Sequence, residues 1–285
     1  MKKKIGLVLE GGAMRGMWTC GVLDSFLDNN VNVDGIIGTS AGGLFGVNYV
    51  SKQRERGIRY NKKYCKDYRY MSIFSLLLTG NIINKKFAFY KVSTKLDPFD
   101  NEEFKKSKID FFVTATNVET GCAEYFKITD PFKDMEKLRA TSAIPLVSRC
   151  VKVDGNKYLD GGVSDSIPIQ KMEEMGYDKI IVVLTQPLDF KKKMISEKKQ
   201  KLVKFVYKRY PNLIKTMFNR HNDYNETIDY IKQQEKNGKV FVIRPSKKLD
   251  IGVVERNPDK LDEIYKIGLK DGEKYIKKLK LFIEK

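Results

Sequence analysis

Gly38-Thr39-Ser40-Ala41-Gly42 fits the G-x-S-x-G pattern, at a point where an apolar run is followed by a helix-forming run. In a strand–turn–helix of this kind the glycines permit a sharp turn that exposes the serine hydroxyl. The N-terminus of the next helix favours negative charge that develops beside it. Ser40 is therefore a candidate nucleophile with Gly38 and Gly42 at its flanks, although the motif alone fits an ordinary glycine turn equally well.

A second glycine turn, Gly11-Gly12-Ala13-Met14-Arg15-Gly16, also follows a short apolar run and precedes a helix-forming run. Backbone N–H groups in such a turn converge on one point, which suits a phosphate or an oxyanion. The turn departs from the dinucleotide-binding pattern G-x-G-x-x-G at Ala13, and it lacks the lysine-Ser/Thr ending of a P-loop. An oxyanion hole needs only donors near a nucleophile, and Ser40 supplies that nucleophile. We therefore favour the oxyanion hole.

The base that would activate the serine is restricted by the single histidine of the chain, His221. The order Ser40, Asp160, His221 matches the triad of α/β-hydrolases. However, His221 lies in the polar segment 218–224, which resembles a solvated helix or connection, and Ser40 comes earlier in the chain than that fold places its nucleophile. Without a histidine, a carboxylate must accept the serine proton directly.

Asp160-Gly161-Gly162 supplies such a carboxylate after the strand-like run 157–159. An aspartate before two glycines at the end of a strand is by itself most often a plain turn residue. Its interest comes from the shortage of histidine, which leaves Asp160 as the candidate partner of Ser40.

The elements that must position these motifs alternate between strand and helix through the first two-thirds of the chain. This order predicts an α/β fold with a mostly parallel central sheet and helices on its faces. The expected strands are 4–9, 33–38, 109–116, 124–128, 179–184 and 239–243, and the expected helices are 16–27, one ending near residue 50, and 258–285. Two basic insertions, 52–69 and 189–215, interrupt the rhythm and are candidates for a cap over the site.

The composition restricts the class of protein. With 285 residues, 41% of them hydrophobic, the chain is long enough for one large folded domain, and intrinsic disorder is excluded. Lys and Arg number 54 against 36 Asp and Glu, a net charge of +18. Such a charge attracts anionic partners, either a phospholipid surface or nucleic acid, although lysine-rich composition also occurs without functional meaning.

Targeting and metal signals are weak. Four scattered cysteines without a C-x-x-C pair argue against a zinc site and indicate reduced thiols. The basic start resembles a signal peptide, but the apolar run 5–9 is too short for one and predicts a buried first strand. No segment approaches the roughly 20 apolar residues that span a bilayer. We expect a cytoplasmic protein, at most peripheral at the inner membrane face.

Together these motifs closely resemble those of the patatin-like phospholipases, in particular their bacterial cytoplasmic branch. The resemblance covers about residues 4–187 and rests on the segments 6–16, 38–42 and 160–162, supported by 115–117, 140–145 and 167–168. It implies a patatin-like three-layer α/β sandwich, with 1–188 as the catalytic core. The remainder, 189–285, would be a basic, mainly helical C-terminal portion packed on that core.

The resemblance also implies roles for the residues. Ser40 would be the nucleophile and Asp160 its base, in a dyad without histidine. The turn that holds Gly11, Gly12, Ala13 and Gly16 would form the oxyanion hole, with Arg15 as a nearby basic residue. The family usually has glycine where Ala13 stands, and alanine resists a positive φ.

The expected activity is hydrolysis of a lipid or phospholipid ester through an acyl-enzyme, without metal or cofactor. The basic surface would contact anionic membrane, and the apolar run 71–78 could touch acyl chains. A soluble carboxylesterase acting on a non-lipid ester is the alternative. A nucleotide- or nucleic-acid-binding protein is less favoured, because the chain carries no recognised nucleic-acid motif. We therefore expect no nucleic acid among the partners.

Overall fold

A central sheet organises the computed structural model, which describes residues 3–284 and leaves residues 1, 2 and 285 outside the description. The strand order is β5-β6-β3-β2-β1-β7-β8, and β4 pairs with β3 beside that path. The strands are β1 (Ile5–Leu9), β2 (Gly35–Thr39), β3 (Asp110–Asn117), β4 (Ala123–Lys127), β5 (Val151–Val153), β6 (Asn156–Asp160), β7 (Lys179–Val183) and β8 (Val240–Ile243). Neighbours from β3 through β8 along the path pair in parallel, whereas β4, β5 and β6 pair antiparallel.

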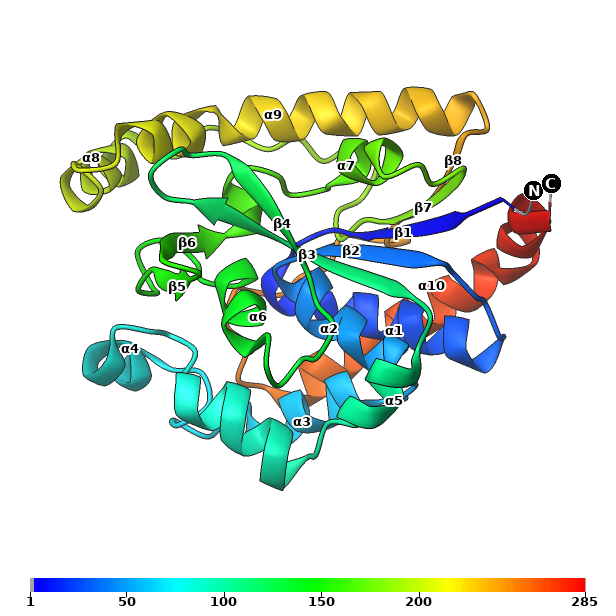
Figure 1. The fold of residues 1–285 in the computed structure, drawn as a ribbon, viewed down its shortest axis with the longest axis horizontal. Coiled ribbons are helices and arrows are strands. Elements are labelled where there is room, and N and C mark those ends of the chain that lie inside the picture. The colour runs from blue at the N-terminus through cyan, green and yellow to red at the C-terminus, as the bar shows by residue number, and fades with distance from the viewer. Residues whose placement is uncertain (1–2, 285) are drawn as a thin grey trace.

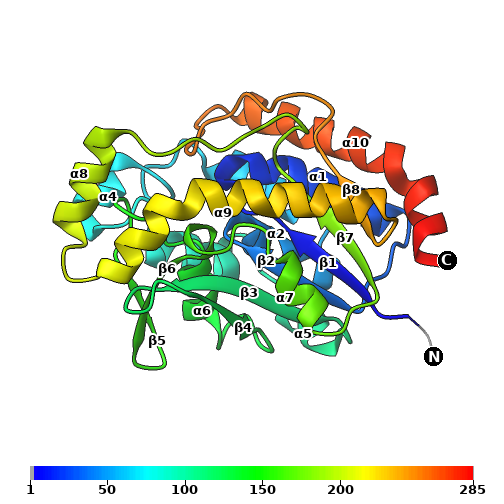
Figure 2. The same cartoon turned by 90° about the horizontal axis from the view of Figure 1, so that it is seen from above.

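Helices cover both faces of this sheet, so the molecule has three layers (Figures 1 and 2). They are α1 (Gly16–Asp28), α2 (Ala41–Val50), α3 (Arg56–Tyr64), α4 (Ile73–Thr79), α5 (Asn101–Lys106), α6 (Met135–Thr141), α7 (Ile169–Glu174), α8 (Glu197–Val206), α9 (Pro211–Lys236) and α10 (Pro258–Glu284). Two 3₁₀ turns, η1 (Ala13–Arg15) and η3 (Gly161–Val163), and a π-helix, η2 (Lys85–Leu96), complete the list. In Figure 1, α7 and α9 lie above the sheet and α1, α2 and α10 lie below it.

The central strands are apolar throughout because both of their faces are covered. In β1, Leu7 packs into the core on the α1 and α10 side, and the next residue, Val8, packs into the core on the α7 and α9 side. Successive side chains of a strand point to opposite faces, so a strand between two helical layers must be apolar at every position.

The last hundred residues complete the same sheet. The strand β8 pairs with β7 in parallel, with Val242 opposite Val182. The helix α10 lies against α1 so closely that a Cβ on Gly268 would overlap the carbonyl of Trp18. The indole of Trp18 also donates a 2.9 Å hydrogen bond to Asp271 in that buried contact. The C-terminal portion therefore belongs to the sheet and, through α9 and α10, to both of its covering layers.

The fold class expected from the sequence, a mostly parallel α/β sandwich, is confirmed. The expected strands correspond to β1, β2, β3, β4, β7 and β8 within two residues at each end. The expected last helix reaches Glu284, and its final residue, Lys285, lies outside the described residues. The sequence predicted a mainly helical C-terminal portion but gave no bounds for the 26-residue α9, since only Leu213, Met217, Tyr224, Ile228 and Ile231 are buried along a largely polar helix.

Candidate active site

The strand β3 lies between the two segments that carry the candidate dyad. It pairs in parallel with β2, where Thr114 is opposite Thr39, and antiparallel with β6, where Ala115 is opposite Asp160. Ser40 directly follows Thr39 at the end of β2. Ser40 and Asp160, which are 120 positions apart in the chain, therefore lie on the two sides of β3.

Ser40 occupies a strained turn between β2 and α2, with φ of 53° and ψ of −121°. A non-glycine residue adopts such a positive φ only where its surroundings enforce it. The Ser40 N–H donates a 2.8 Å hydrogen bond to the buried Thr141 hydroxyl. A Cβ at Gly38 would lie 2.6 Å from the Gly43 nitrogen, and one at Gly42 would overlap the Leu9 carbonyl. The turn therefore requires glycine on both sides of the serine.

The Ser40 hydroxyl donates a 2.6 Å hydrogen bond to Oδ2 of Asp160, and both side chains are buried. The second carboxylate oxygen, Oδ1, accepts a 2.7 Å bond from the N–H of Gly162. Burial raises the pKa of Asp160 above its usual value, although the bonds from Ser40 and Gly162 and the charges of Arg220 and Lys192 oppose that rise. A carboxylate with a raised pKa is a stronger base than an ordinary aspartate.

The glycine-rich turn lies against the same serine. A Cβ at Gly11 would lie 3.1 Å from the Cβ of Ser40. The N–H of Gly11 is occupied by a 3.3 Å bond to the carbonyl of Ser166. Within residues 3–284, no hydrogen bond uses the N–H groups of Gly12 and Ala13. The unused donors of the turn therefore include those of Gly12 and Ala13.

Three other residues named from the sequence, Gly16, Gly161 and Arg15, contact neighbouring helices, strands or side chains. Gly16 begins α1, where a Cβ would lie 2.5 Å from the ring of Phe45 in α2. Gly161 begins η3 so close to β3 that a Cβ would overlap a carbonyl of that strand. Arg15 lies partly exposed at the end of η1, and its Nε donates a 3.5 Å bond to the hydroxyl of Thr185.

Three residues that the sequence did not single out lie beside the dyad. The buried Glu10 accepts bonds from the N–H of Thr185 at 2.5 Å and from the hydroxyl of Tyr224 at 2.9 Å, which links the end of β1 to α9. Arg220 of α9 donates to the carbonyl of Gly162. The ammonium of Lys192 lies 4.1 Å from the centre of the Tyr224 ring. No local pattern distinguishes Lys192 from its neighbouring lysines, so only the fold identifies it.

The single histidine lies apart from the dyad. His221 is on α9, and its Nδ1 is 2.9 Å from the carbonyl of Phe218 in the preceding turn. In the described part of the chain no hydrogen bond connects His221 with Ser40 or Asp160. The arrangement therefore presents a serine and a carboxylate in contact, without an imidazole between them.

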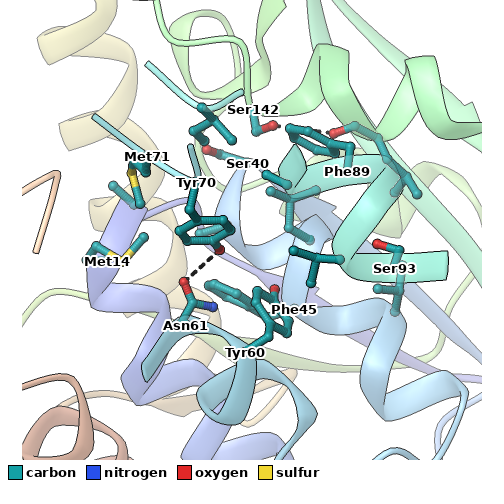
Figure 3. A pocket seen from close by; sticks show the side chains of 18 of the residues that line it. Met14, Ser40, Phe45, Tyr60, Asn61, Tyr70, Met71, Phe89, Ser93 and Ser142 are labelled. Carbon is teal, nitrogen blue, oxygen red and sulfur yellow. Dashed lines mark hydrogen bonds between the residues drawn. The ribbon is translucent and has the colours of Figure 1, made fainter. Parts of the chain in front are cut away.

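A deep apolar cavity opens beside Ser40 (Figure 3). Its empty space is about 1050 Å³, including open solvent at its mouth. Figure 3 shows Ser40 and Ser142 on one side of the cavity and Phe45, Tyr60 and Asn61 on the other. The remaining apolar lining includes Met14, Leu44, Tyr70, Met71, Ile82, Ile83, Phe89, Val92, Phe99, Met135 and Leu138. A cavity of this chemistry suits an extended hydrocarbon chain.

The described residues contain no group of three or more His, Cys, Asp or Glu side chains that could hold a metal ion. The four cysteines are free thiols. In the same part of the chain no helix is long and apolar enough to cross a membrane.

The chain belongs to the patatin-like phospholipase family, a class of lipid ester hydrolases, because the model of that family matches residues 7–172. Residues 210–284 match a second model, a domain of unknown function designated DUF6363. The first match contains both turns and the Asp-Gly-Gly segment, and the second contains α9, β8 and α10.

Three comparisons with individual proteins accompany this match. The chain is 27% identical to the uncharacterized protein YjjU of Escherichia coli over 93% of its own length and 75% of YjjU. It is 25% identical to lysophospholipase NTE1 of Candida albicans over 93% of this chain, but this region makes up only 19% of that protein. The crystal structure of VipD from Legionella pneumophila matches 98% of this chain and 67% of that chain with 11% identity and a TM-score of 0.45.

The glycine-rich turn generates a test of backbone strain. Ala13 has a φ of 48°, in the region that alanine resists. The substitution Ala13→Gly removes this strain from the folded state. The greater conformational freedom of glycine in the unfolded chain offsets part of that gain, so we expect the free energy of unfolding to rise by about 0.5–1 kcal/mol. Urea denaturation followed by circular dichroism measures the change.

The matched control is Ala140→Gly in the helix α6, where φ is negative and glycine should lower the free energy of unfolding by about 1 kcal/mol or more. Equal losses in both variants would contradict strain at Ala13.

Proposed function

We propose that this protein hydrolyses acyl esters of lipids through a Ser40–Asp160 dyad and an acyl-enzyme. The observation that carries the proposal is the 2.6 Å hydrogen bond from the Ser40 hydroxyl to Asp160 at the wall of an apolar cavity. Unused N–H donors of Gly12 and Ala13 beside the serine support an oxyanion hole.

The reaction would proceed in two balanced steps. Asp160 accepts the proton of Ser40 while Oγ attacks the ester carbonyl, and the amides of Gly12 and Ala13 stabilise the oxyanion by about 3 kcal/mol each. Collapse of the tetrahedral intermediate breaks the ester bond, and the proton passes from Asp160 to the departing alcohol. Water then attacks the acyl-enzyme with Asp160 as base, which releases the fatty acid and restores Ser40.

The cavity and the relatives support a lipid as substrate. An acyl chain bound among apolar side chains would place its ester at Ser40, at the edge of the cavity. The NTE1 relatives are named lysophospholipases, which favours a single-chain phospholipid. Because this chain matches less than a fifth of those proteins, substrate identity rests on the proposal and its tests.

Membrane contact would bring such lipids to the cavity. The short helix α4 lies in the chain between Met71 and Ile82, which both line the cavity, and its Leu77 and Leu78 side chains are 79% and 68% exposed. The helix α8 exposes Phe205 by 75% and carries four lysines. Both helices lie at the same end of the molecule in Figures 1 and 2. Exposed apolar side chains beside lysines suit an anionic bilayer surface.

The membrane contact predicts a loss of binding in a variant of α4. The double variant Leu77→Ser/Leu78→Ser should bind phosphatidylglycerol vesicles about tenfold or more weakly, because burial of one leucine contributes about 1.5–3 kcal/mol. Vesicle sedimentation measures the partition coefficient.

Leu281→Ser is the matched control, because Leu281 is 52% exposed in the last turns of α10, at the opposite end of the molecule (Figure 1). Unchanged binding by the α4 variant would refute the assignment of this surface.

The dyad predicts separate effects of its two members. Ser40→Ala should abolish labelling by a fluorophosphonate, and both Ser40→Ala and Asp160→Asn should lower kcat/KM for a soluble uncharged ester by about 10³-fold or more. Mass spectrometry of the labelled protein locates the modified residue. His221→Ala tests the triad instead, and a comparable loss in that variant would replace the dyad by a triad.

The raised pKa of Asp160 predicts a pH profile. The carboxylate is active when deprotonated, so kcat/KM should rise with pH through a pKa above that of an ordinary aspartate. The charge of Arg220 lowers this pKa, so Arg220→Gln should move the rise to still higher pH. The exposed Arg209 supplies the control variant Arg209→Gln. If Arg220→Gln leaves the pH dependence of kcat/KM unchanged, Asp160 is not the titrating base.

A further inference from the structure

Three cations that do not line the apolar cavity lie close enough to one another and to Asp160 and Glu10 for their charges to interact. Arg15 comes from η1, Lys192 from the segment before α8, and Arg220 from α9. None of the three lines the cavity that contains Ser40. Among residues 3–284, none has a carboxylate oxygen within 4.0 Å. Partly buried cations are usually paired, so this cluster needs a physical reason.

The contacts of the three cations are with neutral groups. Arg220 donates to the carbonyl of Gly162, two residues after Asp160. Arg15 contacts the Thr185 hydroxyl at 3.5 Å, and Lys192 lies over the ring of Tyr224 at 4.1 Å. Within residues 3–284, most of their N–H donors therefore have no hydrogen-bond acceptor.

Glu10 and Asp160, the carboxylates whose charges act on Lys192 and Arg220, are already satisfied by neutral donors. Asp160 accepts from Ser40 and Gly162, and Glu10 accepts from Thr185 and Tyr224. Neither forms an ion pair with the three cations, so the cluster has a surplus of one positive charge over Glu10 and Asp160.

The electrostatics agree with mutual repulsion among the cations. The pKa of Lys192 is lowered to about 7, chiefly by burial and next by Arg220, with a further lowering by Arg15. Glu10 and Asp160 act in the opposite direction and do not compensate. A dianion or monoanion bound between the cations would remove this repulsion.

We infer that Arg15, Lys192 and Arg220 form a binding site for the phosphate of an acylated glycerol phosphate, the headgroup side of the substrate. This inference rests on the proposed function, since it requires that Ser40 attacks the acyl ester. The apolar cavity would take the acyl chain beside Ser40, and the cations outside that cavity would take the phosphate. Guanidinium and ammonium groups are the side chains that bind phosphate oxygens most strongly, especially where water is partly excluded.

The assignment gives the C-terminal portion a role in substrate choice. Arg220 lies within residues 210–284, the stretch that matches a domain of unknown function, and Lys192 lies between the two matched models. Two of the three phosphate-binding residues would therefore lie outside the stretch that the patatin-like phospholipase model matches, whereas Arg15 lies within it.

The test compares two monomeric short-chain substrates with the same acyl group, an acylglycerol phosphate and an uncharged monoacylglycerol. Wild-type protein should show a higher kcat/KM for the phosphate. Lys192→Gln should lower the ratio of the two kcat/KM values about tenfold, because one charge-assisted hydrogen bond is lost. Lys192 is the informative position, since among the described residues no hydrogen bond joins it to the active-site groups, whereas Arg220 donates to Gly162 beside Asp160. The charge of Lys192 also lowers the pKa of Asp160, but a change in that pKa acts on both substrates alike and cancels in their ratio.

The exposed neighbour Lys193 supplies the matched control, and Lys193→Gln should leave the ratio unchanged. A wild-type ratio of one or less, or a ratio unaffected by Lys192→Gln, would overturn the phosphate site while both substrates are still hydrolysed. Inhibition by inorganic phosphate that Lys192→Gln abolishes, without preference for the acylglycerol phosphate, would assign the site to free phosphate and overturn the headgroup. Loss of hydrolysis of both substrates by the wild type, without labelling of Ser40, would instead contradict the proposed function.

Discussion

The strand β3 is the constraint on which the candidate site depends. It pairs in parallel with β2 and antiparallel with β6, so its residues 114 and 115 lie opposite Thr39 and Asp160. This change of direction within one sheet brings the end of β2 and the end of β6 to the same point. A shift of register by one residue in either pairing would turn the side chains to the other face of the sheet and separate Ser40 from Asp160.

The second constraint is the close approach of two turns that have little room for side chains. Ser40 and Ala13 both have a positive φ, and Gly11 lies against the Cβ of Ser40. The strain is held by the surrounding core, and the buried Glu10 fixes the end of β1 through bonds to Thr185 and Tyr224. Rigid turns of this kind place N–H donors where negative charge would develop, without reorganisation during the reaction.

The surroundings of Ser40 combine an apolar cavity with positively charged side chains. An apolar cavity opens beside Ser40, and partly buried cations from the later part of the chain lie near Asp160 outside that cavity. That later part also supplies β8 to the sheet and α10 to the layer against α1. A molecule with an apolar tail, an ester and an anionic head would match this order of environments, and exposed leucines of α4 extend the apolar side to the surface.

The sequence alone determined the fold class, the strands near both turns and the motifs, because an apolar strand followed by glycines and a helix is a local pattern that neighbouring residues specify. It also predicted the pair Ser40 and Asp160 from the motifs and the family resemblance, but their contact itself depends on pairing across 120 residues. The contacts of Lys192 and Arg220 were decided only by tertiary structure. Each is an ordinary basic residue in a basic segment, and its environment comes from the packing of α9 over Glu10 and Gly162. Local sequence carries no signal for such contacts.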